Sequence, residues 1–486
     1  MSIRPEMNAL DDSDLAVQRW RRVFVWLVMA IYLLLLTEGA LRKWVLPGQQ
    51  QMLYFIKDPL VLSAYAVAAA GGLWPRGRGL FVVALVFAFL GGFLAVVQAV
   101  LSAGGLFGLL MAGYGWRSYF LYVPLAFLIA DHFDLADLRR VVRLTLWFTV
   151  PVAALVLLQY GAGADAVINK GLLPGQGFDS MPVYGGIIRP AGLFTASAGQ
   201  TQFVASAVAL LAAAWLWRTP PRPMGLVPLS IATAAVLLCV AVGGSRGGVI
   251  AALLIGAATM LGGFLVGNAR LALAGFALPV LLAVVLLVVA PLLVPEATTA
   301  FVNRWENAYE VESQYSRFGI IARAFAGFYD FVRLLPEAPL FGWGLGMGGN
   351  ASVLLDLNSE IPYAETGWAR HVIDLGPVFG LLFIGFRVAL TLYAGVLALR
   401  SARRRQDLLA LLLFAYLCPV LLLEAITGQG TVQVYTWLFL GFTLAASRPQ
   451  TKGEDTGTLP RAAAASSGGR CLMSPREDGG RLGAHA

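Results

Sequence analysis

The sequence predicts an all-α fold, a polytopic transmembrane bundle of about twelve helices, and two observations support this prediction. Of the 486 residues, 58% are hydrophobic and 13% are charged, and the mean hydropathy is +0.74. Soluble domains are only about 45–50% apolar and about 25% charged. Apolar runs of about 18 or more residues also recur along the chain, and each is long enough to cross about 30 Å of hydrocarbon as a helix.

Each of these apolar runs begins and ends at polar residues, proline or glycine. The expected helices cover 23–37, 59–74, 79–101, 118–130, 141–160, 193–217, 226–243, 248–267, 271–294, 372–399, 408–427 and 432–447. The first run is followed by charged residues and lacks a small-x-small cleavage site, so we expect a retained helix rather than a removed signal peptide. The span 118–130 is short, and its loss would invert every later helix.

The distribution of arginine and lysine predicts that both termini are cytoplasmic. With that orientation, 15 basic residues fall in the inside loops and seven in the short outside loops, as the positive-inside rule requires. The expected parts are a cytoplasmic segment 1–22, helices one to nine in 23–294, a large periplasmic loop 295–371, helices ten to twelve in 372–447 and a disordered cytoplasmic tail 448–486. The net charge of +8 therefore reflects topology and not nucleic-acid binding.

The long loop contains two segments that suggest a site. Apolar residues recur at spacings of three and four from Phe318 to Leu335 and predict an amphipathic helix that stops at Pro336. It either covers a pocket on the membrane surface or packs as ordinary loop structure. The glycine-rich segment 341–350 permits unusual backbone turns, and Glu365 to His371 brings an acid, an indole, a guanidinium and an imidazole to the next helix.

Two arginines lie where the chain enters apolar helices on the same expected side. Arg189 precedes Pro-Ala-Gly-Leu-Phe, and Arg246 lies in Gly-Gly-Ser-Arg-Gly-Gly between two spans. A guanidinium at membrane depth needs water or an anionic partner, and its fork matches phosphate oxygens. The alternatives are snorkelling, capping of a helix end, or structural pairing with Glu38, Asp58 and Glu424.

These motifs resemble the O-antigen ligase and polymerase superfamily of bacterial membrane glycosyltransferases. The resemblance rests on Arg189-Pro-Ala-Gly-Leu-Phe, Ser245-Arg-Gly, Pro339-Leu-Phe-Gly-Trp-Gly-Leu-Gly346 and Asp374-Leu-Gly-Pro-Val-Phe-Gly380. It covers the middle and C-terminal half of the chain and is closer to exopolysaccharide polymerases than to ligases. It implies polymerisation or ligation of undecaprenyl-pyrophosphate-linked oligosaccharide at the periplasmic face of the bacterial inner membrane.

The resemblance also implies roles for individual residues. Arg189 and Arg246 would bind the pyrophosphate, while the substrate loop would include Arg317, Gly344, Gly346, Trp368 and Arg370. The family usually has a His-Asn pair about eleven residues before the Leu-Gly of the last motif, and Glu365 stands there in this chain. The general base is therefore Glu365, His371 after a local shift, or neither.

The resemblance implies no metal and no cofactor, and the three cysteines offer no Cys-x-x-Cys pair. The expected partners are the lipid-linked donor, a saccharide or lipid-linked acceptor, membrane lipids and chain-length or export proteins, but no nucleic acid. Twelve helices with both termini inside also describe a secondary transporter or a lipid-linked saccharide flippase. A non-catalytic assembly scaffold is a third possibility.

Overall fold

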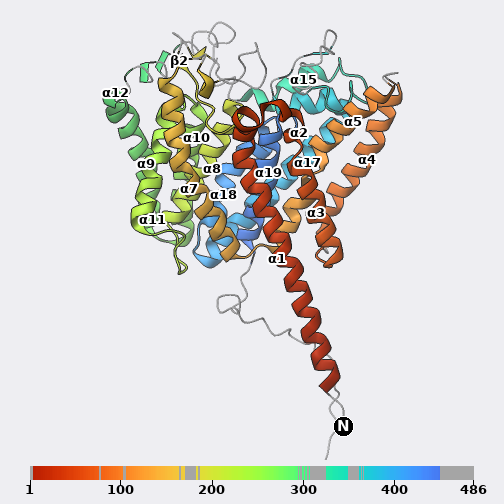
Figure 1. The fold of residues 1–486 in the computed structure, drawn as a ribbon, viewed down its shortest axis with the longest axis horizontal. Coiled ribbons are helices and arrows are strands. Elements are labelled where there is room, and N and C mark those ends of the chain that lie inside the picture. Colours follow the sequence, from red (N-terminus) through yellow and green to blue (C-terminus); the bar gives the residue numbers. More distant parts are fainter. Residues whose placement is uncertain are drawn as a thin grey trace, which may run out of the picture. The chain divides into compact units, whose positions relative to one another are not determined.

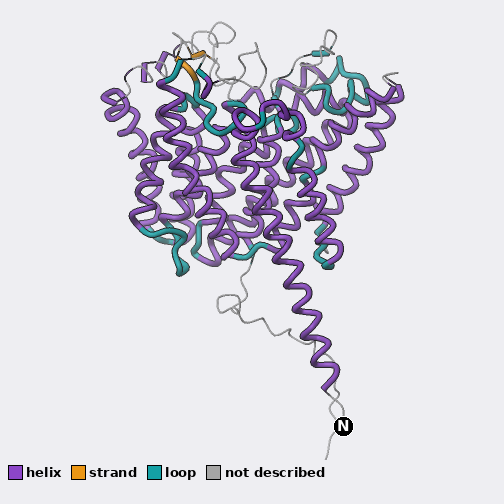
Figure 2. Tube along the Cα trace, in the orientation of Figure 1, coloured by secondary structure: helices purple, strands orange, loops and turns teal. Residues whose placement is uncertain are grey.

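The helices of residues 1–448 form one compact unit, drawn in Figure 1 and coloured by secondary structure in Figure 2. The computed structural model describes residues 4–75, 78–101, 105–163, 166–169, 182–183, 187–293, 295, 298–299, 302–303, 306, 325–348, 361–362, 364 and 366–448. The predicted disordered tail lies outside these residues, except for Arg448.

Within the described residues, every regular element except a two-stranded ribbon is helical. The α-helices are α1 (Arg4–Ala40), α2 (Gln50–Tyr54), α3 (Lys57–Ala70), α4 (Gly79–Leu101), α5 (Gly105–Phe120), α6 (Val123–His132), α7 (Leu135–Gly161), α8 (Ser197–Trp215), α9 (Leu226–Val242), α10 (Arg246–Val266), α11 (Ala269–Val284), α12 (Ala290–Leu293), α15 (Asp330–Leu334), α17 (Gly367–Arg405), α18 (Leu409–Leu423) and α19 (Gly430–Ser447). The other elements are η1 (Leu41–Val45), η2 (Pro47–Gln49), η3 (Val167–Asn169), η4 (Val285–Val289), η5 (Ala326–Phe328), β1 (Pro182–Val183) and β2 (Ile187–Ile188), with β1 antiparallel to β2.

Eight helical segments of the described residues are long and apolar enough to cross a membrane. They cover Leu15–Val45, Pro47–Ala70, Gly79–Val100, Leu135–Gly161, Ser197–Trp215, Arg246–Val266, Ala269–Leu292 and Gly367–Arg405. The chain is therefore a helical membrane protein. The apolar helices α9 and α18 are shorter, so length and composition identify eight candidate spans among the described residues and do not confirm the predicted twelve.

The short span expected at 118–130 is two consecutive helices. The indole Nε1 of Trp116 in α5 donates to the carbonyl of Ala88 in α4 at 2.8 Å, and the two helices form a hairpin. The helix α6 then begins at Val123 with Pro124 in its first turn, where a missing N–H costs nothing. Arg78, just before α4, pairs with Asp131 near the end of α6, and α4 packs against both α5 and α6. Residues 105–132 therefore run back along α4 as two consecutive helices.

The expected amphipathic helix is interrupted in its described part. Residues 318–324 lie outside the described residues, and from Phe325 onward the chain forms η5, a break at Tyr329 (φ −132°) and the short helix α15. The helix ends just before Pro336, as predicted. Phe328 and Phe331 meet the ring of Trp368 edge-to-face, with centroids 5.4 and 5.7 Å apart. This part of the loop therefore packs on the start of α17.

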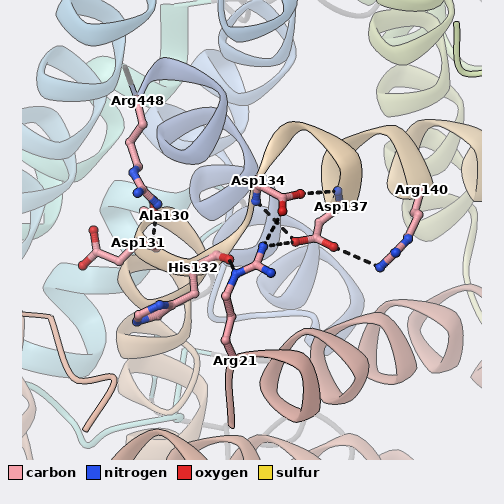
Figure 3. Close-up of polar contacts among 8 residues, drawn as sticks. All are labelled: Arg21, Ala130, Asp131, His132, Asp134, Asp137, Arg140 and Arg448. Atoms are coloured by element: carbon pink, nitrogen blue, oxygen red, sulfur yellow. Dashed lines mark hydrogen bonds and ion pairs between the residues drawn. The ribbon is translucent and has the colours of Figure 1, made fainter. Parts of the chain in front are cut away.

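At one end of the bundle, Arg21 joins α1 to α7 (Figure 3). Its guanidinium donates to Asp134 Oδ2 at 2.7 Å and to Asp137 Oδ2 at 2.6 Å. Asp134 is the N-cap of α7 and forms a capping box with Asp137, which satisfies the first N–H groups of the helix. This cap explains why α7 begins at Leu135, six residues before the predicted span.

Further arginines at this end hold the neighbouring connections. Arg78 pairs with Asp131. The guanidinium of Arg448 donates to the carbonyls of Ala130 and Asp131 (Figure 3). Arg143 donates to the carbonyl of Pro223 at 3.0 Å. We refer to the end that contains Arg21, Arg78, Arg143 and Arg448 as the basic end, and to the opposite end as the site end. In Figure 1, α2, α15 and β2 all lie at the site end.

We predict that Arg21→Ala lowers the thermal stability of the protein. The change removes the guanidinium that lies 2.6 Å from Asp137, which is only 3% exposed. Asp137 keeps Arg140 and the N–H of Asp134 as donors, so the expected cost is that of one hydrogen bond to a charged group, about 1.5–3 kcal/mol. Thermal unfolding in detergent measures the effect. The matched control is Arg22→Ala, because Arg22 is the exposed neighbour of Arg21 on α1. Equal melting temperatures for the two variants would contradict the prediction.

Candidate functional site

Three hydroxyl and guanidinium groups bring the Arg189 and Ser245-Arg246 motifs together at the site end. Arg189 Nη2 donates to Thr201 Oγ1 at 3.3 Å, and this oxygen lies 3.0 Å from Ser245 Oγ. Thr201 belongs to the first turns of α8. Ser245 is the N-cap of α10, where its Oγ accepts from the N–H of Gly247, and Arg246 is the first residue of that helix. The two predicted pyrophosphate-binding arginines therefore flank the paired N-termini of α8 and α10.

The loop that presents Arg189 is fixed by a side chain of α7. Gly192 donates its N–H to Gln159 Oε1 at 2.8 Å and accepts from Gln159 Nε2 at 3.2 Å. Lys43 Nζ lies 3.2 Å from the same carbonyl oxygen. Gly192 has φ +60°, and a Cβ there would lie 2.3 Å from Gln200 Oε1. Glycine is therefore required both by the backbone conformation and by the close approach of Gln200.

Gln200 is the unusual residue of this cluster. It is 3% exposed, and neither its Oε1 nor its Nε2 has a hydrogen-bond partner among the described residues. Buried amides are normally paired, because an unpaired one costs about 1–3 kcal/mol. The unpaired amide beside Thr201 therefore points to a polar group that binds here.

The electrostatic surroundings of the cluster favour an anion. Helix N-termini carry partial positive charge and unpaired N–H groups, and two of them meet at Thr201 and Ser245. The sequence has no aspartate or glutamate between Asp179 and Glu296, an interval with five arginines. Two of the acids considered as alternative partners of Arg189 and Arg246 pair elsewhere: Glu38 binds Lys57 and Arg42, and Asp58 binds Arg117 through both carboxylate oxygens.

A second cluster surrounds His371 in α17. Its Nε2 lies 2.7 Å from Arg387 Nη1, and its Nδ1 lies 2.9 Å from the hydroxyl of Tyr119. Arginine can only donate, so Nε2 accepts and a neutral ring carries its proton on Nδ1. Tyr119 then donates to Asp374 Oδ2 at 2.8 Å. The result is a directed chain from Arg387 through His371 and Tyr119 to Asp374, whose members are all at least 99% buried.

Arg387 is held by the polypeptide itself. Its Nε donates to the carbonyl of Leu421 at 2.8 Å, and its Nη2 donates to the carbonyl of Glu424 at 2.8 Å. Both carbonyls lie at the end of α18, where the last carbonyls of a helix have no intrahelical partner. The buried guanidinium therefore joins α17 to the end of α18 and orients the imidazole.

Asp374 and Gln98 hold the glycine-rich loop against the bundle. Asp374 Oδ1 accepts from the N–H of Gly348 at 2.6 Å, and Gln98 Oε1 accepts from the N–H of Leu345 at 2.9 Å. Gln98 Nε2 also donates to the carbonyl of Asp374 at 3.0 Å. Gly344 and Gly346 have φ +135° and +86°, conformations that other residues rarely adopt. These two predicted substrate-loop residues therefore shape a loop that is anchored next to the His371 cluster.

Two further predicted residues, Trp368 and Arg370, lie in the first turn of α17. Trp368 Nε1 donates to the carbonyl of Leu422 at 2.6 Å, and Arg370 Nε donates to the carbonyl of Ala364 at 3.0 Å. Arg370 is 7% exposed, yet its Nη1 has no hydrogen-bond partner among the described residues. A Cβ on Gly428 would collide with that nitrogen, so glycine makes room for the guanidinium.

The structure therefore places seven of the nine predicted site residues at the site end. Arg189 and Arg246 gather at α8 and α10, and the other five, Gly344, Gly346, Trp368, Arg370 and His371, gather at α17 and its loop. Glu365 and Arg317 lie outside the described residues. Among the described residues, no three His, Cys, Asp or Glu side chains are arranged to hold a metal ion.

Sequence reasoning missed Arg387, Tyr119 and Gln98. The sequence does contain a signal for two of them. Arg387 is the lone arginine of the apolar span 372–399, and Gln98 is the lone glutamine of 79–101. Such polar residues cost free energy in a membrane and are commonly functional or structurally paired. Tyr119 carried none, since aromatic residues are common near helix ends.

Comparisons with protein-family models, with curated proteins and with solved structures found no match to this chain. The resemblance to the O-antigen ligase and polymerase superfamily therefore stands on the short motifs alone.

We predict that Tyr119→Phe destabilises the protein by about 1–3 kcal/mol, because it removes the hydroxyl that bridges two buried groups. Asp374 Oδ2 loses its donor, while Asp374 Oδ1 keeps the N–H of Gly348. Thermal unfolding in detergent measures the effect. The control is Tyr393→Phe, because Tyr393 lies in α17, the helix that contains His371, but outside the hydrogen-bonded chain. The prediction is wrong if Tyr119→Phe melts no earlier than Tyr393→Phe.

Proposed function

We propose that the chain is a membrane glycosyltransferase that polymerises or ligates undecaprenyl-pyrophosphate-linked oligosaccharide. The observation that carries this proposal is the contact of Arg189 with Thr201 of α8 and of Thr201 with Ser245, next to Arg246 at the N-terminus of α10. The buried amide of Gln200, which has no hydrogen-bond partner among the described residues, lies in the same cluster. Two guanidinium groups and two helix N-termini provide what a diphosphate at the membrane surface needs.

The proposal also specifies how many times the chain crosses the membrane and which side each end of the bundle faces. Together with α9, α18, α19 and the consecutive pair α5–α6, the eight candidate spans would make twelve crossings. The basic end would then be cytoplasmic by the positive-inside rule, and the site end would face the periplasm of a bacterial inner membrane. A donor flipped to that side would meet the arginines at headgroup depth.

In the proposed reaction, an acceptor sugar hydroxyl attacks the anomeric carbon of the donor. The bond between this carbon and the pyrophosphate oxygen breaks, and undecaprenyl pyrophosphate leaves with the bonding electrons. Arg189 and Arg246 stabilise the negative charge that grows on the leaving phosphate, and fixed charges of this kind are often the largest contribution to catalysis. A general base accepts the hydroxyl proton.

The geometry of the His371 cluster favours a positioning role for His371 over a base. Both ring nitrogens are already hydrogen-bonded, and the side chain is fully buried. A base must reach the acceptor hydroxyl, so Glu365, which occupies the family position, is the base in this proposal. His371 would act through Tyr119 and Asp374 on the glycine-rich loop.

We predict that Arg189→Gln and Arg246→Gln each reduce transfer about 10²–10³-fold, the loss typical when one group that stabilises developing charge is removed. Membrane vesicles with a radiolabelled lipid-linked saccharide measure the transfer. Arg22→Gln, an exposed arginine of the basic end, is the control. Full activity in both site variants would refute the assignment.

We predict that Glu365→Gln abolishes transfer and that Glu365→Asp retains part of it. His371→Gln should lower kcat and the melting temperature while leaving the acidic limb of the pH–rate profile unchanged, because the base that titrates there is a different group. A profile that loses this limb in His371→Gln, but keeps it in Glu365→Asp, would make His371 the base.

One observation favours a proton-coupled transporter as the second candidate. Buried chains of acidic, aromatic and imidazole groups form proton relays in transporters, and the Asp374, Tyr119, His371 and Arg387 chain has this composition. A strain that lacks this protein distinguishes the two candidate functions. Lipid-linked repeat units that reach the outer face and accumulate there indicate the transferase, and units retained on the cytoplasmic face indicate a transporter or flippase.

A further inference from the structure

A groove of about 360 Å³ lies between four helices. It is lined by α8 and α10, through residues such as Leu211 and Gly256, and by α9 and α11, through residues such as Thr233 and Ala274. The volume is within the roughly 300–1,000 Å³ range of small-molecule sites.

Small residues create this space where α10 and α11 meet. A Cβ on Gly256 would lie 2.6 Å from the carbonyl oxygen of Gly275, and one on Gly263 would lie 2.2 Å from the backbone nitrogen of Ala272. Such close backbone approach is typical of membrane helix pairs. The two helices are therefore fixed against each other, while α9, which also lines the groove, approaches α10 where Val240 lies beside Gly248.

The groove offers hydrocarbon and almost no free polar group. The hydroxyls of Thr233 and Thr259 donate to the carbonyls of Leu229 and Ile255 in their own helices, both at 2.8 Å. Trp215 Nε1 donates to Thr233 Oγ1 at 3.1 Å. Because α8, α10 and α11 are candidate membrane spans, the molecules that reach this groove are lipids, and the part that enters it is a hydrocarbon chain.

Arginines continue the groove toward the basic end. Ala274, Ala277 and Leu281 line it from α11, and Arg270 lies one turn before Ala274 on the same face of that helix. Arg218 follows two residues after Leu216, which lines the groove at the end of α8. Both arginines are exposed.

The charge near this mouth has no acidic counterpart in the helices that form it. The interval between Asp179 and Glu296 contains no aspartate or glutamate and includes α8, α9, α10 and α11. Basic groups at the membrane surface between helices are the usual recognition elements for anionic headgroups. An apolar groove that leads to positive charge matches the acyl chain and the headgroup of one anionic lipid.

We propose that this groove binds an anionic glycerophospholipid, with one acyl chain between α9 and α11 and its phosphate near Arg218 and Arg270. This site is separate from the proposed transferase site. It would hold α9 against the α10–α11 pair by filling the space between them.

Native mass spectrometry of the full-length protein tests the proposal, with phosphatidylglycerol and phosphatidylcholine of identical acyl chains as probes. The wild type should retain phosphatidylglycerol more strongly than phosphatidylcholine. Each arginine near an anionic surface contributes about a fivefold preference, so Arg270→Gln should weaken phosphatidylglycerol retention about fivefold and Arg218→Gln combined with Arg270→Gln about 25-fold. Arg22→Gln, on α1, should leave it unchanged.

A steric pair of variants tests the groove itself. Ala277→Trp places an indole in the groove from an exposed position, whereas Leu273→Trp changes an exposed residue of the same helix that does not line it. The first should abolish phosphatidylglycerol retention and the second should preserve it. Equal retention of both lipids by the wild type, unchanged retention in the arginine variants, or binding of undecaprenyl phosphate in preference to phosphatidylglycerol would each overturn the proposal.

Discussion

Arg387 must find all of its hydrogen-bond acceptors inside an apolar helix bundle, and this constraint organises the site end. Its guanidinium is fully buried and bonds the carbonyls of Leu421 and Glu424 and the ring of His371. The imidazole orients Tyr119, and Tyr119 with Asp374 anchors the glycine-rich loop. A buried charge without such partners would cost several kcal/mol. One side chain therefore connects α17, α18, α5 and the loop.

The two ends of the bundle use charge differently. At the basic end, Arg21, Arg78 and Arg140 pair with aspartates at or near the ends of α6 and α7, so these three charges are matched within the protein. At the site end, Arg189 and Arg246 lie in a stretch of sequence without acidic residues, and the amide of Gln200 has no hydrogen-bond partner among the described residues. A matched network stabilises a fold, whereas positive charge at helix N-termini beside a buried polar side chain suits an anionic ligand.

Much of the fold could be predicted from the sequence, because hydropathy fixes apolar spans well. The helix predicted at 79–101 coincides with α4, and the helix predicted at 226–243 differs from α9 by one residue. Predictions failed where local chemistry overrides hydropathy: the capping box at Asp134 starts α7 early, and a break before Pro124 divides 118–130. The motifs also located Arg189 and Arg246. Tyr119 could not be found, since its role depends on a contact with His371, 252 residues away.

A structure of the full-length protein with undecaprenyl pyrophosphate, determined by electron cryomicroscopy in a lipid nanodisc, tests the central claim most directly. Our account predicts density for the diphosphate within about 3 Å of both the Arg189 and Arg246 guanidinium groups, with Gln200 Nε2 facing a phosphate or sugar oxygen. A diphosphate bound elsewhere, or arginines that turn away from it toward protein carboxylates, would contradict the account.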